Sequence, residues 1–187
     1  MDKKALRLAA MQARDQLTDA ERARASAAIC DRVFAMDEVR EAKVVFSYLA
    51  MRTEVDLAAL HWRLRERGIC LAFPVVGEDG RMEAYAPDVR MLLEPDRFGI
   101  LAPVTEAARK VDPAELDLIL TPCVAFDDAC RRLGHGGGYY DRYFASCPRA
   151  KRICIAFEVQ RLPCVPAQAW DMPMDCVVTE AGSYHRK

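Results

Sequence analysis

The sequence has no long apolar segment and few histidines, and each shortage excludes a class of protein. No stretch approaches the roughly 18 apolar residues of a membrane span or a secretion signal. With three histidines and no C-x-x-C pair, a zinc site is not expected. A formal net charge of −1 gives no general attraction to nucleic acid or to a membrane surface. We therefore expect a cytoplasmic protein that binds neither nucleic acid nor membranes.

Cysteine is not scarce, but the eight thiols form no recognisable framework. No two are closer than seven residues; they stand at positions 30, 70, 123, 130, 147, 154, 164 and 176. A disulfide framework would also conflict with a cytoplasmic location. We expect most of these cysteines to be small buried hydrophobic residues.

Length and pattern predict a single domain over residues 1–187, because domains of about 100–200 residues enclose one core. Helical spacing and capping signals predict helices at 2–16, 19–36 and 56–67. Apolar runs predict strands at 43–49, 69–74, 82–85, 118–126, 151–157 and 175–179. The proline-containing stretch 86–113 is predicted to be irregular, with a helical turn near 104–109. This alternation predicts a Rossmann-like α/β fold, with helices flanking a mostly parallel central sheet.

Four of the nine glycines fall between positions 134 and 138. They follow the apolar run 118–126 and precede a helical start at Tyr140, so the order is strand, turn, glycine loop and helix. Glycines let consecutive backbone N–H groups face one anion, and a helix N-terminus adds partial positive charge. A tight surface turn is the simpler alternative. Arginines before the loop and tyrosines after it favour a phosphate site.

The glycine loop matches no established nucleotide motif. The pattern G-x-x-x-x-G-K-[ST] is absent, and a dinucleotide fingerprint starting at Gly134 would need a glycine in place of Tyr139. The loop therefore predicts a phosphate site without identifying the phosphate.

Three loops are expected at the carboxyl ends of the strands, where open α/β sheets bind ligands. One follows Leu49 and carries Glu54, the second is the glycine loop, and the third contains Asp171 and Asp175. Taken singly, a loop carboxylate is usually only solvated. Taken together, Asp141 and Asp175 could share a hard cation, and Glu54 could hold a polar heterocycle.

The segment 132–142, Arg-Leu-Gly-His-Gly-Gly-Gly-Tyr-Tyr-Asp-Arg, resembles the signature of the 5-formyltetrahydrofolate cyclo-ligase family. Further blocks resemble the family in its order and span nearly the whole chain: the basic helix with Lys3 and Arg7, the folate segment 48–56, and the closing motifs 171–175 and 178–180.

The resemblance implies an ATP- and Mg²⁺-dependent ring closure. It would convert 5-formyltetrahydrofolate to 5,10-methenyltetrahydrofolate and release ADP and phosphate. The formyl carbon belongs to an amide and is a poor electrophile because of resonance. Transfer of a phosphoryl group to the formyl oxygen would activate that carbon for attack by N10. The implied partners are these small molecules, and we expect the protein to act as a monomer.

The resemblance also implies roles for individual residues. The catalytic residues would be Arg132, His135 and Tyr139. ATP would contact Lys3, Arg7, Arg132, Leu133, Gly134, His135, Gly136, Gly137, Gly138, Tyr139 and Tyr140. The folate would contact Leu49, Glu54, His135, Gly136, Gly137, Gly138 and Tyr139. Mg²⁺ would be held by Asp141 and Asp175.

Several alternatives remain open at this level. Some family members have a basic residue where His135 stands, and some have a lysine where Gly137 stands, so part of the phosphate contact here could pass to backbone N–H groups or to Arg132. Without the resemblance, Lys3 and Arg7 fit a solvated helix face. The chain could also be a silent folate- or nucleotide-binding module. A sugar-phosphate isomerase or acyl-CoA transferase is a third possibility, with Glu54 as its base or nucleophile.

Overall fold

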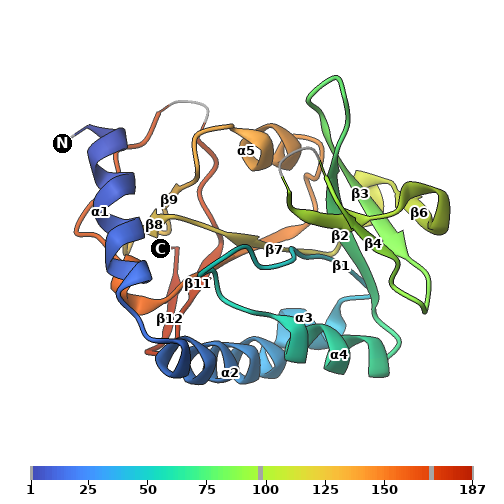
Figure 1. The fold of residues 1–187 in the computed structure, drawn as a ribbon, viewed down its shortest axis with the longest axis horizontal. Helices are drawn as coiled ribbons and strands as arrows, with labels where there is room; N and C mark the ends of the chain where they lie inside the picture. The colour runs from blue at the N-terminus through green and yellow to red at the C-terminus, as the bar shows by residue number, and fades with distance from the viewer. Residues whose placement is uncertain (1, 97–98, 169–170, 187) are drawn as a thin grey trace.

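The computed structural model describes residues 2–96, 99–168 and 171–186. Its centre is an eight-stranded sheet (Figure 1). The spatial order is β12 (Ser183–His185), β11 (Cys176–Val178), β10 (Lys151–Ile155), β7 (Leu118–Pro122), β1 (Val44–Phe46), β2 (Cys70–Val76), β3 (Met82–Pro87) and β6 (Ala108–Val111). The five strands from β11 to β2 pair in parallel, and antiparallel strands close both edges. The predicted mostly parallel α/β sheet is confirmed.

Except for the short helix at 37–41, which the sequence does not predict, the helices begin within two residues of the expected positions. They are α1 (Lys3–Asp15), α2 (Asp19–Ala35), α3 (Asp37–Glu41), α4 (Ala58–Glu66) and α5 (Tyr139–Phe144), with short 3-10 turns η1 (Thr105–Ala107), η2 (Pro113–Glu115) and η3 (Glu158–Gln160). The predicted capping box opens α2, because the backbone N–H of Glu21 donates to Thr18 Oγ1 and the backbone N–H of Thr18 donates to Glu21 Oε2. After α4 the chain passes through Gly68 at a φ of 76°, a left-handed conformation that suits glycine.

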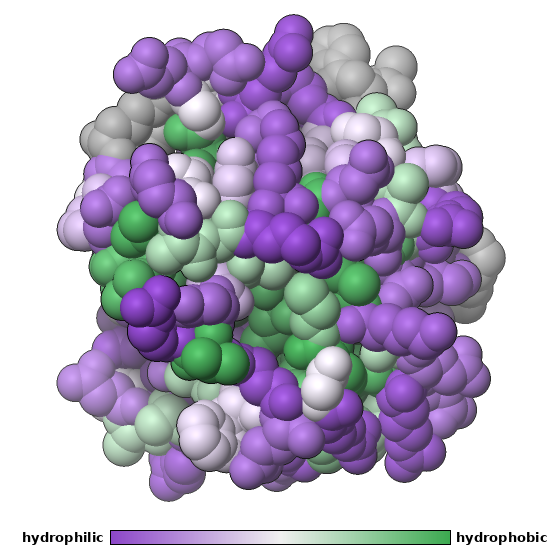
Figure 2. All heavy atoms as spheres, turned by 90° about the vertical axis from the view of Figure 1, so that its right-hand side faces the viewer, coloured by the Kyte–Doolittle hydropathy of each residue, from purple (hydrophilic) through white to green (hydrophobic). Residues whose placement is uncertain are grey.

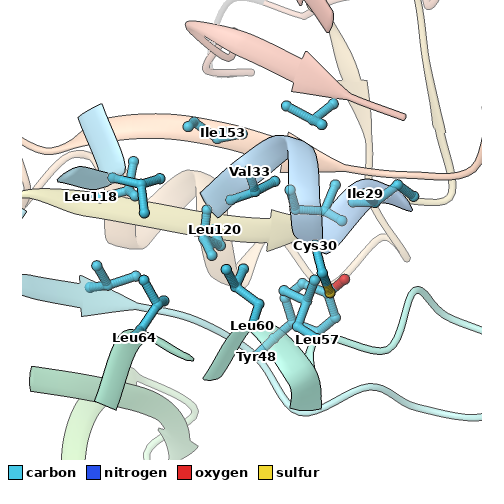
Figure 3. Close-up of a cluster of buried hydrophobic side chains, with 14 of the residues drawn as sticks. Ile29, Cys30, Val33, Tyr48, Leu57, Leu60, Leu64, Leu118, Leu120 and Ile153 are labelled. Atoms are coloured by element: carbon cyan, nitrogen blue, oxygen red, sulfur yellow. The ribbon is translucent and has the colours of Figure 1, made fainter. Parts of the chain in front are cut away.

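The sheet separates two apolar layers because successive side chains of a strand point to opposite faces. Leu118 and Leu120 pack with the layer of α2 and α4 (Figure 3), whereas Ile119 packs with the layer of α5. All three side chains are fully buried, which stabilises the fold by about 1.5–3 kcal/mol for each. In Figure 1, α2, α3 and α4 lie below the sheet and α5 lies above it.

Helix α1 lies apart from both layers, at one end of the sheet (Figure 1). It packs on a small third cluster formed by Leu6, Ala10, Val124, Ala125, Leu133 and Val165. Part of that cluster belongs to the antiparallel pair β8 (Ala125–Phe126) and β9 (Arg132–Leu133). Because β9 leads directly into the glycine loop, this third cluster supports both α1 and the start of that loop.

Two predictions about the strands are wrong. The predicted strand 118–126 is interrupted: β7 ends at Pro122, which lacks the N–H needed to continue the ladder, and β8 pairs with β9 instead. The stretch 86–113 is not mainly irregular. It forms the pair β4 (Leu93–Pro95) and β5 (Leu101–Pro103), and its end forms the edge strand β6. The predicted helical turn in this stretch corresponds to η1.

Six cysteines are buried, Cys70 is half-buried and Cys164 is exposed. The prediction that most thiols act as small hydrophobic residues is confirmed. In the part of the chain that the structure describes, no helix combines the length and apolar character needed to cross a membrane.

Candidate functional site

The loop after β1 forms a tight turn that closes on Glu54. The backbone N–H of Glu54 donates to Met51 O at 2.9 Å, and the N–H of Met51 donates to Glu54 Oε2 at 3.0 Å. Between them, Arg52 has a φ of 48°, which few residues other than glycine adopt. Only 4% of the Glu54 side chain is exposed. The turn therefore fixes a buried carboxylate at the carboxyl edge of the sheet.

The glycine loop approaches this turn. His135 Nε2 lies 3.3 Å from Glu54 Oε1, so the two loops that the sequence assigns to one site do meet. Burial raises the pKa of Tyr48 and of Tyr140, and the negative charge of Glu54 raises both further. Both phenols therefore stay neutral at physiological pH, and the Tyr48 hydroxyl donates to Val55 O at 3.0 Å. A carboxylate and an imidazole are groups that can hold a polar heterocycle.

Helix α1 closes the other side of the glycine loop. Arg7 Nε donates to Gly134 O at 2.7 Å, and a Cβ on Gly136 would lie 3.6 Å from the Arg7 guanidinium. Gly136 has a φ of 107°, a conformation that favours glycine. Lys3 Nζ pairs with Asp171 Oδ2 at 2.7 Å. The alternative of a solvated helix face for Lys3 and Arg7 is therefore wrong.

Arg132 lies beneath the loop, with 5% of its side chain exposed. Its Nη2 pairs with Asp141 Oδ2 at 3.1 Å and its Nη1 donates to Pro122 O at 3.4 Å. A Cβ on Gly134 would lie 3.0 Å from the same guanidinium, so the loop backbone packs directly on it. In this arrangement Arg132 orients Asp141 from below. The predicted direct contact between Arg132 and phosphate is not what this geometry favours.

The structure does not bring Asp141 and Asp175 together. Asp175 precedes β11, and its carboxylate accepts from the backbone N–H of Arg152 at 2.8 Å and pairs with Arg186 at 3.5 Å. In β10, Ile155 pairs with Pro122, which lies near Asp141. Arg152, the partner of Asp175, stands three positions before Ile155, and three residues of a strand span about 10 Å. The predicted shared cation site is not formed, because a residue that begins a parallel strand lies at the opposite edge from the ligand loops.

Asp171 lies closer to Asp141 than Asp175 does. The backbone N–H of Met172 donates to Asp141 Oδ1 at 3.3 Å, and the preceding residue, Asp171, pairs with Lys3. Two carboxylates therefore border the glycine loop from α5 and from the segment before β11. Among residues 2–96, 99–168 and 171–186 there is no group of three or more potential metal ligands. A pair still fits Mg²⁺, which keeps several waters and takes one or two carboxylates beside phosphate oxygens.

Residues 1–180 match the model of the 5-formyltetrahydrofolate cyclo-ligase family. The chain belongs to this family. The cyclo-ligase of Haemophilus influenzae is 29% identical over 167 residues, which cover 86% of this chain and 88% of the relative. The cyclo-ligase of Mus musculus is 28% identical over 189 residues and covers 95% and 93% of the two chains.

Solved structures show the same relationship. The 5,10-methenyltetrahydrofolate synthetase of Aquifex aeolicus has a TM-score of 0.88 at 31% identity, covering 99% of this chain and 93% of that one. The synthetase of Mycoplasma pneumoniae has a TM-score of 0.80 at 25% identity and covers 96% and 99%. The resemblance in segment 132–142 is confirmed, and the chain is an enzyme of the cyclo-ligase family with a part in folate metabolism. The isomerase and transferase alternatives lose their support.

Three other predicted site residues of this cyclo-ligase chain have packing roles. Leu133 is 2% exposed within the α1 cluster, so only its backbone could reach a ligand. Leu49 is half-buried against the α2 and α4 layer. A Cβ on Gly137 would lie 2.7 Å from the Tyr139 ring, so this ring fills the space that a side chain at position 137 would need. Over that ring lies the Arg142 guanidinium, at 5.1 Å.

A separate cavity of about 220 Å³ lies between the end of α4 and the strands β2 and β3. It is lined by Arg65, Ile69, Cys70, Leu71, Phe73, Pro87, Asp88 and Val89. Figure 2 shows the side of the molecule that carries β3 and β6, where apolar groups lie among hydrophilic ones. Since none of the residues expected for the cyclo-ligase site lines this cavity, it is not the candidate site.

Proposed function

We propose that the chain catalyses the ATP- and Mg²⁺-dependent cyclisation of 5-formyltetrahydrofolate to 5,10-methenyltetrahydrofolate. The observation that carries this proposal is the contact between His135 and Glu54, because it joins a glycine loop suited to phosphate with a buried carboxylate suited to a heterocycle. Family membership and the names of the relatives support the same reaction.

The reaction proceeds in two steps. The formyl oxygen attacks the γ-phosphorus of ATP, the bond to ADP breaks, and the formyl group becomes an iminium phosphate. N10 then attacks the formyl carbon, loses its proton and expels phosphate, which leaves the 5,10-methenyl bridge. Little covalent chemistry falls to the protein, which positions the reactants and stabilises charge.

The ATP phosphates occupy the space between α1 and the glycine loop. Backbone N–H groups of residues 134–138 supply donors, and only His135 among them carries a Cβ. Arg7 and Lys3 add positive charge from the other side. The Arg7 guanidinium is already held by Gly134 O, so little side-chain entropy is lost when phosphate binds.

Glu54 binds the reduced pterin. Its two oxygens accept from Met51 and lie near His135, and each oxygen retains lone pairs for further donors. A pterin presents adjacent N–H groups, which one carboxylate accepts in a charge-assisted contact. His135 borders both ligands from the glycine loop, where it acts by position.

Asp141 and Asp171 hold Mg²⁺ in this proposal, in place of the predicted pair with Asp175. When bound, the cation would neutralise charge on the phosphates. Arg132 keeps the Asp141 carboxylate directed at the loop. In the absence of the cation, Lys3 neutralises Asp171. Once the cation binds, Lys3 is free to turn toward the phosphates.

We also propose that residues 1–187 act as one catalytic domain and as a monomer in the cytoplasm. The site is assembled from residues between Lys3 and Asp171 of one chain, and the family match covers 1–180, which supports a single functional unit. Light scattering after gel filtration would test the monomer.

The direct test incubates the purified protein with 5-formyltetrahydrofolate and Mg-ATP. We expect the absorbance of methenyltetrahydrofolate to rise in step with phosphate release. Folate binding without product would identify the silent binding module instead, and product without an ATP requirement would overturn the mechanism.

A further inference from the structure

Helix α1 contacts both halves of the site, one near each end. Arg7 meets the glycine loop, and Arg14, seven positions later, reaches the turn that carries Glu54. Residues seven apart lie on the same face of a helix, about 10 Å from each other along its axis. The helix therefore spans the distance between the expected nucleotide and folate positions.

Two side chains at the end of α1 form hydrogen bonds with one hydroxyl group, that of Thr53. Arg14 Nε donates to Thr53 Oγ1 at 3.1 Å, and Thr53 Oγ1 donates to Asp15 Oδ1 at 2.5 Å. Thr53 lies directly before Glu54, inside the turn closed by Met51. Since the hydroxyl both accepts and donates here, its position is fixed by two side chains of the helix.

The surroundings of the Arg14 side chain are unfavourable for a residue that only stabilises the fold. Only 4% of its side chain is exposed, its nearest carboxylate is 3.9 Å away on the exposed Asp15, and its Nη1 is buried without a partner. A buried charge with an unmade hydrogen bond costs stability, and an apolar replacement of similar size is often neutral or stabilising. Its presence therefore needs an explanation other than stability.

We propose that Arg14 is a positioning residue that sets the turn 51–54, and with it the Glu54 carboxylate, relative to the glycine loop. Small movements of α1 on its six-residue cluster would otherwise change the spacing of the two loops. Arg14 ties the helix to the folate side as Arg7 ties it to the nucleotide side. This inference rests on the proposed function, since it concerns folate binding at Glu54.

The experiment compares Arg14→Met, Arg14→Lys, Thr53→Val and the double variant Arg14→Met/Thr53→Val. Arg63→Met is the matched control, because Arg63 also joins two elements, pairing from α4 with Asp31 of α2 at 2.6 Å. The readouts are the Kd of 5-formyltetrahydrofolate by calorimetry, the KM of each substrate, kcat and the Tm.

We expect Arg14→Met to weaken folate binding about tenfold, the usual effect of one lost hydrogen bond to a charged group, with the KM for ATP nearly unchanged. The Tm should stay level or rise. Thr53→Val should act in the same direction, and the double variant should be no worse than Arg14→Met, because the two residues form one contact. Arg14→Lys, which keeps a donor, should be affected less than Arg14→Met, and Arg63→Met should bind folate like wild type.

Unchanged folate binding in Arg14→Met would overturn this inference, as would equal losses for both substrates or a folate defect that follows a fall in Tm. Those results require a working wild-type enzyme. A wild-type protein that neither binds nor converts the folate would instead overturn the proposed function, and this inference with it.

Discussion

The Arg132 guanidinium lies 3.1 Å from the Asp141 carboxylate, with 5% of the arginine side chain and 23% of the aspartate side chain exposed. One partner is thus enclosed under the glycine loop while the other reaches its surface. An arginine held between Pro122 O and a carboxylate directs that carboxylate outward. The pair explains how the negative charge of Asp141 can border the glycine loop at the surface.

Asp141→Asn should therefore reduce turnover strongly and leave folate binding nearly intact. Losing one charge weakens the proposed metal–phosphate bridge, and we expect a fall of about 100-fold at saturating ATP. Asp175→Asn is the matched control and should turn over close to wild type, because its partners are Arg152 and Arg186. Steady-state kinetics across Mg²⁺ concentrations decide the matter. A larger loss of turnover in Asp175→Asn than in Asp141→Asn would instead assign Asp175 to the metal site.

Arg7→Ala should raise the KM for ATP and lower kcat. If Arg7 stabilises charge in the transition state as a fixed donor, the loss is on the order of 10²–10³. Lys4→Ala provides the comparison, since Lys4 is an exposed residue of the same helix. ATP kinetics that match wild type in Arg7→Ala would show that the contact with Gly134 only holds the loop.

Glu54→Gln should weaken 5-formyltetrahydrofolate binding by roughly 1.5–3 kcal/mol. The substitution keeps the shape but places an NH₂ donor where the pterin also donates. Calorimetry with each ligand separately should show ATP affinity close to wild type. If ATP affinity falls while folate affinity holds, Glu54 belongs to the nucleotide side and the two ligands are exchanged in our proposal.

His61 should make stability depend on pH. Burial lowers its pKa from 6.5 to about 4, and its Nε2 lies 2.7 Å from Ser47 Oγ. Between these values the unfolded chain binds more protons, so stability is complete above about pH 6.5 and falls as the pH drops toward 4. The shift corresponds to about 3 kcal/mol. The free energy of unfolding, measured with urea, should differ less between pH 7 and pH 4.5 in His61→Gln than in the wild type. The same difference in both proteins would show that His61 is not the cause.

Much of the fold could be predicted because local signals agreed with the final packing. The capping box at Thr18 and the apolar runs around Leu118 and Ile153 agreed with one type of structure each. The edge elements could not be predicted in the same way. Strand β12 has three residues, too few for a period to be visible, and the pairing of β4 with β5 depends on partners that no local pattern reveals.

The site was predictable in its parts and less so in its details. Glycine spacing located the glycine loop, and the carboxyl-edge rule placed Glu54 beside it, as the contact with His135 confirms. That Asp171 rather than Asp175 lies near Asp141 follows from the direction of β11, which the apolar run that begins after Asp175 already indicates. The burial of Arg132 under the loop could not be foreseen, because the same basic residue at a loop entrance is compatible with either face.

Docking of α1 depends on a small apolar cluster and on contacts between distant parts of the chain. The Arg7–Gly134 hydrogen bond joins residues 127 positions apart, and the Lys3–Asp171 pair joins residues 168 apart. Elements with few buried contacts open locally at a lower free energy than the core. Catalytic inactivation in urea should therefore precede the loss of circular dichroism, and coincident curves would contradict this. ATP, which in our proposal binds only the docked helix, should bring the two transitions closer together.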